Sequence, residues 1–163
     1  MENQPKRFGK RLCRTVRTKD IGAIVGLLLW VGAAWAEAEV AVIVHKEVAL
    51  DTLDRGELLD LYTGDDKFWD DKAPVVVLDL KPKGEVKEAF YRFLGKSPSR
   101  MKTIWMRKML SGEGDPPAAL ETEQDIVDKV AATPGAIGFV GRAEVNEKVK
   151  TLLLIKWPAK KGR

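Results

Sequence analysis

Uninterrupted apolar runs separate the charged segments of this chain, and four of them have the length of strands. Runs of four to eight apolar residues suit strands that are covered on both faces of a sheet, whereas helices usually need longer patterns. The predicted strands are Glu39–His45, Val75–Leu78, Ala136–Val140 and Lys150–Ile155.

Between these runs the apolar residues recur at helical spacing, and polar residues mark where the helices begin and end. A first helix is predicted over Arg55–Thr63, because Asp54 can cap its first turn, Glu57 follows three residues later, and Gly64 comes just past its end. A second helix ends at Gly95, and its apolar face is Val86, Ala89, Phe90, Phe93 and Leu94.

Two further helices carry the same kind of signals. Ser97 precedes Pro98 at a helix start, and this third helix ends near Gly112. Thr122 with Asp125 opens a fourth helix. Strands that alternate with helices predict an α/β fold: one layered lobe with a mostly parallel sheet flanked by helices.

The N-terminal segment reads as a secretory signal peptide over residues 1–36. Seven Lys or Arg residues precede an uncharged apolar run, Ile21–Ala36, whose 16 residues are short for a membrane span of about 20. Ala34-Trp35-Ala36 offers a cleavage site, and Ala36-Glu37-Ala38 is an alternative; a retained anchor is the other interpretation. We therefore predict a domain over 37–155 and a basic tail over 156–163, in the periplasm after cleavage.

Cleavage would change the charge of the protein. The whole chain holds 28 basic and 24 acidic residues, of which seven and two lie before residue 37, so 21 and 22 remain and the net charge becomes −1. Nucleic-acid binding is therefore not expected from the charge. Cleavage would also remove Cys13, the single cysteine of the sequence, and with it disulfide and thiol chemistry.

Charge is segregated within the remaining chain. Residues 47–79 hold ten acidic and three basic residues, and residues 80–110 hold nine basic and two acidic residues. Two interpretations stand side by side: solvated helix faces, or a cluster of Lys81, Lys83 and Lys87 at one helix start that attracts an anion.

Several sequence pieces, taken in order from about Val40 to Val140, resemble a known family. The pieces are L-D-R-G-E-L-L-D-L-Y-T-G followed by Trp69, then V-V-V-L-D-L, K-E-A-F-Y-R-F-L, Trp105, S-G-E-G-D-P-P and T-P-G-A-I-G-F-V. This order resembles one lobe of the phosphate-type periplasmic substrate-binding proteins of ABC transporters. The resemblance implies a lobe of the type II periplasmic-binding-protein kind, a phosphate or other oxyanion ligand, and a membrane transporter or sensor as partner.

The chain departs from that family in two respects. It has room for one lobe, whereas a typical member has two that close over the ligand. Where the family places Ser-Gly-Thr before K-E-A-F, this chain has Lys83-Gly84-Glu85-Val86, and an arginine that often precedes the motif falls near Leu80. The missing hydroxyls and the Glu85 carboxylate weaken phosphate binding, but backbone N–H groups at the helix start can still bind an anion.

The predicted ligand-binding set follows from this helix start, and it comprises Lys81, Lys83, Gly84, Glu85, Val86 and Lys87. The alternative is a protein-interaction module that has lost its small-molecule site. No cofactor, metal or enzymatic activity is predicted.

Other candidate sites have simpler interpretations. His45 stands alone as a surface or satisfied histidine. The aspartates between residues 65 and 71 lack calcium-loop spacing and fit a solvated turn pinned by a buried Trp69, with a calcium site as the alternative. Trp105 fits the core better than a stacking platform.

Overall fold

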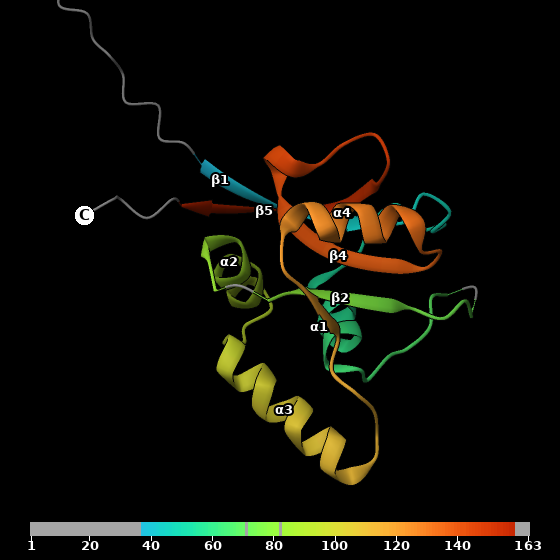
Figure 1. Ribbon diagram of the computed structural model, residues 1–163, viewed down its shortest axis with the longest axis vertical. Coiled ribbons are helices and arrows are strands. Elements are labelled where there is room, and N and C mark those ends of the chain that lie inside the picture. The colour runs from blue at the N-terminus through green and yellow to red at the C-terminus, as the bar shows by residue number, and fades with distance from the viewer. Residues whose placement is uncertain (1–36, 71, 82, 159–163) are drawn as a thin grey trace, which may run out of the picture. The chain divides into compact units, whose positions relative to one another are not determined.

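A computed structural model of the chain describes residues 37–70, 72–81 and 83–158, and Figure 1 shows how its elements are arranged. The predicted signal peptide and the last five residues lie outside this part. In chain order the elements are β1 (Glu37–Val44), α1 (Arg55–Thr63), β2 (Val76–Leu80), α2 (Glu85–Phe93), α3 (Pro98–Ser111), β3 (Ala118–Leu120), α4 (Glu123–Ala132), β4 (Ala136–Gly141), a 3₁₀ turn (Arg142–Glu144) and β5 (Lys150–Pro158).

The strands form one five-stranded sheet in the order β3-β2-β4-β1-β5. β2 is parallel to both β3 and β4, whereas β1 is antiparallel to both β4 and β5. Four of the five strands therefore point the same way and β1 opposes them, which confirms the prediction of a mostly parallel α/β sheet.

Helices cover both faces of this sheet, and β4 shows which helix covers which face. Gly138 faces α4, because a side-chain carbon there would meet Ile126. Phe139 points to the other face, where its ring stacks on Phe90 of α2 at 3.9 Å between centroids and lies 6.0 Å from the ring of Tyr62 of α1. β4 is buried along most of its length because both faces are covered.

The polar signals at the helix starts act as predicted. The Asp54 side chain accepts a hydrogen bond from the Glu57 N–H, and the Glu57 side chain accepts one from the Asp54 N–H. Thr122 and Asp125 form the same reciprocal pair at α4. Each pair supplies acceptors for two backbone N–H groups that the start of a helix would otherwise leave without a hydrogen bond.

Two segments differ from the sequence prediction. Residues 118–120, for which no element was predicted from the sequence, form β3, a short edge strand that pairs with β2. β5 was predicted to end at Ile155, yet it continues to Pro158 because its last residues pair with the beginning of β1. Trp157 also stacks on Arg92, whose guanidinium carbon lies 3.8 Å from the centre of the indole ring. Within the described residues, no helix is long and apolar enough to cross a bilayer.

Candidate functional site

The candidate site lies where three parallel strands end. β2, β4 and β3 end at Leu80, Gly141 and Leu120, and these carboxyl ends share one edge of the sheet because the strands are parallel. α2 and α4 begin at the same edge, with their positive dipole ends toward it. In open α/β sheets this is the edge at which ligands bind.

The start of α2 differs from the starts of the other three α-helices. Asp54, Ser97 and Thr122 cap α1, α3 and α4 with their side chains. At α2 the N-cap is Gly84, which has no side chain to accept a hydrogen bond, and no heavy atom lies within 4 Å of where its side-chain carbon would be. The first turn of α2 is therefore free of a side-chain cap and open to an outside acceptor.

The three predicted lysines have different surroundings. Lys87 Nζ lies 2.9 Å from Asp79 Oδ2 and also donates to the Leu80 carbonyl, and both charged side chains are mostly buried. Lys81 forms an ion pair with Glu121. Lys83 has no ion-pair partner within the described part of the chain, so it is the cation of the three that remains open to a ligand.

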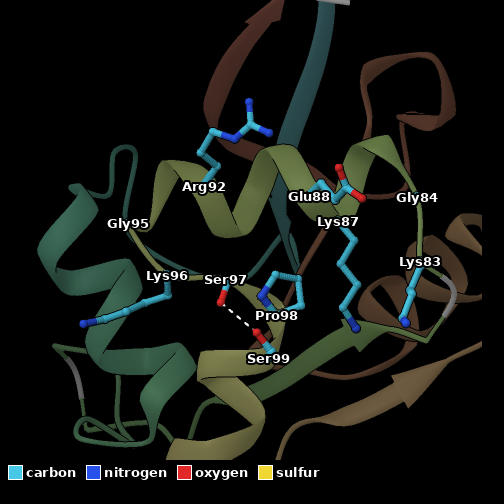
Figure 2. A pocket seen from close by; sticks show the side chains of 10 residues that line it. All are labelled: Lys83, Gly84, Lys87, Glu88, Arg92, Gly95, Lys96, Ser97, Pro98 and Ser99. Atoms are coloured by element: carbon cyan, nitrogen blue, oxygen red, sulfur yellow. Dashed lines mark hydrogen bonds between the residues drawn. The ribbon is translucent and has the colours of Figure 1, made fainter. Parts of the chain in front are cut away.

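A groove of about 650 Å³ runs beside α2, and Figure 2 shows the side chains around it. It brings together three predicted residues, Lys83, Gly84 and Lys87, with residues that the sequence did not indicate. The additional lining residues are Glu88, Arg92, Gly95, Lys96, Ser97, Pro98 and Ser99.

Side-chain directions divide the groove residues into two groups. Lys83 and Lys87 extend to the same side of α2, toward the start of α3, whereas Arg92 extends to the opposite side, where it stacks on Trp157. At the start of α3 the Ser97 and Ser99 hydroxyls lie 3.0 Å apart. The spacing of Gly84, Glu88 and Arg92 by four residues would have indicated one helix face, although it was not used in the prediction. No sequence signal indicated that residues 96–99 return to this groove.

Two more of the predicted residues, Glu85 and Val86, face a second hollow. Glu85 and Val86 line a cavity of about 410 Å³ on the α4 side of the helix start, together with Glu121, Glu123 and Glu144. The Glu123 carboxylate accepts a hydrogen bond from the Gly141 N–H at 2.5 Å. The start of α2 thus separates a groove with several lysines from a cavity with four carboxyl groups.

A mostly buried cluster of Asp79, Lys87 and Tyr91 lies beneath the site. Burial raises the pKa of the Tyr91 hydroxyl far above its ordinary value, and the nearby Asp79 carboxylate raises it further. Lys87 Nζ lies 5.7 Å from the centre of the Tyr91 ring and balances the charge of Asp79. This cluster supports the start of α2 from below and offers no free charge to a ligand.

The other candidate residues have structural roles. The His45 Nδ1 atom accepts a hydrogen bond from the Glu47 N–H, and the Trp105 indole, which is mostly buried, donates to the Tyr62 carbonyl at 3.1 Å. The Trp69 indole is also buried and donates to the Gly135 carbonyl. Among the described residues, no cluster of three His, Cys, Asp or Glu side chains could hold a metal ion.

Solved structures with a similar fold include proteins described as phosphate receptors of ABC transporters. A putative phosphate ABC transporter substrate-binding protein with bound phosphate from Clostridium perfringens matches 71% of this chain and 44% of its own at 20% identity, with a TM-score of 0.59. An ABC-type phosphate transport receptor from Vibrio cholerae matches 77% of this chain and 58% of its own at 13% identity and a TM-score of 0.56. A possible phosphate binding protein from Planctomyces limnophilus matches 72% and 42% at 14% identity and a TM-score of 0.54.

These comparisons define the class of fold. The chain spans about half the length of the structures it matches, so it has the fold of a single lobe of phosphate-type substrate-binding proteins. No protein-family model and no curated protein sequence matches it. At these identities the likeness concerns the fold.

Proposed function

We propose that this chain is a substrate-binding-type lobe that binds an oxyanion, with phosphate as the first candidate, at the start of α2. The observation that carries the proposal is the uncapped N-terminus of α2 at the ligand-binding edge of the sheet, with Lys83 beside it. Backbone N–H groups and the helix dipole favour an anion there. The proposed roles are backbone donation from the Gly84–Val86 turn and charge from Lys83, with Lys81 and Lys87 held by their carboxylate partners.

The solved structures support the kind of ligand and a role beside a transporter. Their names describe phosphate receptors of ABC transporters, and one of them holds phosphate. We propose by this analogy that the chain acts outside the cytoplasm after removal of residues 1–36, binds its ligand without transforming it, and contacts a membrane transporter or sensor.

A thermal-shift titration of the purified protein with phosphate and sulfate, at constant ionic strength, tests the proposal. A ligand that binds only the folded state stabilises it by about 2.7 kcal/mol at a hundredfold excess over Kd. We expect a saturable rise in Tm that Lys83→Glu reduces at least fivefold. Lys46→Glu is the matched control, because Lys46 is exposed in the turn after β1, which ends at the opposite edge of the sheet.

A second variant addresses the backbone donors directly. Gly84→Asp would supply the missing cap, and its side chain has room because nothing lies within 4 Å. We expect this variant to melt higher than wild type without phosphate and to lose the phosphate response. If wild type shows no shift up to millimolar phosphate or sulfate, the oxyanion proposal is wrong.

The second candidate is a protein-interaction module, and a specific observation favours it. Glu85 sits in the first turn of α2, and Glu121 and Asp79 already neutralise Lys81 and Lys87. A site that presents one open cation beside a carboxylate is weaker for a small dianion than a cluster of three lysines. If phosphate and sulfate do not raise the Tm in the titration, we assign the protein to this second class.

A further inference from the structure

Beyond the oxyanion site, one helix presents an outward face that the fold leaves uncovered. α3 buries Met101 and Trp105 against the rest of the protein. Toward the C-terminal end of the same helix, Met106, Met109 and Leu110 are 48%, 47% and 85% exposed. Exposed apolar side chains that gather on one helix turn mark a contact surface more often than scattered ones do.

Positive charge surrounds these apolar side chains. α3 contains no acidic residue over its 14 positions. Arg100, Lys102 and Arg107 are exposed and have no ion-pair partner in the part of the chain that the structure describes. We call the exposed residues Arg100, Lys102, Met106, Arg107, Met109 and Leu110 the α3 outward face.

Two carboxylates beside the end of α3 already have partners. Asp65 is paired with Lys108 Nζ at 2.6 Å, and the Glu113 carboxylate accepts a hydrogen bond from the Ser111 hydroxyl at 2.7 Å. These carboxylates lie beside the end of the helix and leave the cations of the α3 outward face unpaired.

We propose that the α3 outward face binds the headgroup surface of an anionic membrane. Lys and Arg side chains are attracted to anionic headgroups, each by roughly fivefold in partition coefficient, and projecting Leu and Met side chains enter the boundary between headgroups and acyl chains. Such a surface requires charge and apolar side chains but no shaped cavity.

The form of the α3 outward face favours a membrane over a protein groove. Its apolar side chains span only residues 106–110, little more than one helical turn, whereas a helix that docks into a protein groove uses anchors over two or more turns. Of the hollows described near α3, the groove beside α2 reaches only Pro98 and Ser99, and a cavity of about 400 Å³ touches Trp105 on the buried side.

Co-sedimentation of the purified protein with vesicles tests this proposal. We expect binding to vesicles of phosphatidylglycerol and phosphatidylcholine at low salt, weaker binding at high salt, and little binding to phosphatidylcholine alone. Lys102→Glu with Arg107→Glu should reduce the partition coefficient at least 25-fold, and Leu110→Glu at least fivefold. Circular dichroism checks that each variant is folded. We expect the variants to fold because the substituted side chains are exposed.

Matched controls separate this surface from net charge and from the oxyanion site. Lys46→Glu with Lys129→Glu makes the same change in charge at exposed positions away from α3 and should leave vesicle binding within about twofold of wild type. Lys83→Glu should also leave vesicle binding within about twofold of wild type. The thermal-shift and vesicle assays therefore test the oxyanion site and the α3 outward face independently.

Three results would overturn the proposal. One is absence of binding to anionic vesicles at low salt, and another is an equal loss in the α3 and control variants. The third is self-association in light scattering, or binding to an acidic protein in place of vesicles, that Leu110→Glu abolishes. That result would assign the α3 outward face to a protein partner.

Discussion

Gly138 in β4 lies so close to α4 that the smallest possible side chain should disturb the core. A carbon added at this position would lie 2.6 Å from Ile126 Cγ2 and 3.4 Å from Val130 Cγ2. Non-bonded carbon atoms approach to about 3.5–4.0 Å, so Gly138→Ala requires a shift of about 1 Å. Gly138 has no positive φ, and the cost is therefore steric.

The neighbouring side chain cannot easily yield. Ile126 is fully buried, and a β-branched side chain in a helix has one strongly preferred rotamer. α4 must therefore move away from the sheet, and we expect Gly138→Ala to destabilise the protein by about 1–3 kcal/mol.

A double-mutant cycle tests the assigned contact. Ile126→Ala removes the methyl group that clashes, and alone it should cost about 2–5 kcal/mol through the cavity that it leaves. In the double variant the new methyl group at position 138 occupies part of that cavity. We expect the double variant to be more stable than the sum of the single effects predicts, by about 1–2 kcal/mol.

Urea unfolding followed by tryptophan fluorescence measures these differences, provided that the variants keep similar m values. Leu154→Ala, at an exposed position on β5, serves as the control partner and should combine additively with Gly138→Ala. Additivity of Gly138→Ala and Ile126→Ala within about 0.5 kcal/mol would refute the reasoning, because it would mean that the two positions are not in contact.

Two further substitutions probe polar groups. Tyr62→Phe removes a buried hydroxyl that donates to the Leu78 carbonyl at 3.0 Å, and we expect the free energy of unfolding in urea to fall by about 1 kcal/mol; no loss would contradict the bond. Hydrogen bonds from Lys108 and Thr63 hold the pKa of Asp65 below its ordinary value in the folded state. The Asp65 carboxylate therefore stabilises the folded state fully above the unfolded-state pKa of about 3.9. This contribution is lost as the pH falls through the lower folded-state pKa. Asp65→Asn should therefore be less stable than wild type by up to about 1 kcal/mol at neutral pH, with a difference that shrinks below about pH 4 when unfolding is measured across pH, whereas a difference constant with pH would contradict this assignment.

Local signals in the sequence were sufficient for most of the fold. Asp54 and Thr122 marked helix starts because a cap and its partner lie three residues apart, and the T-P-G-A-I-G-F-V segment marked β4 because its apolar run follows a helix stop. β3 was missed because its three residues are largely exposed, and its pairing with β2 alone makes it a strand.

The candidate site was predicted less completely because its charges are balanced by tertiary contacts. Glu121 lies 40 residues beyond the lysine with which it pairs, at position 81. No local pattern indicated that pair, or the approach of Lys96 and Ser97 to the groove. The uncapped start of α2, in contrast, was visible in the sequence, because Gly84 offers no side-chain acceptor.

The position of β1 in the sheet determines when this protein can finish folding. β1 is the first described strand, yet its neighbours are β4 and the last strand, β5, with Glu37 opposite Pro158. These pairings join residues about a hundred positions apart, so loop closure over nearly the whole described chain precedes their formation. A chain that stopped before Lys150 would leave one edge of β1 without a partner. The sheet can be completed only after β5, the last described strand, has been synthesised.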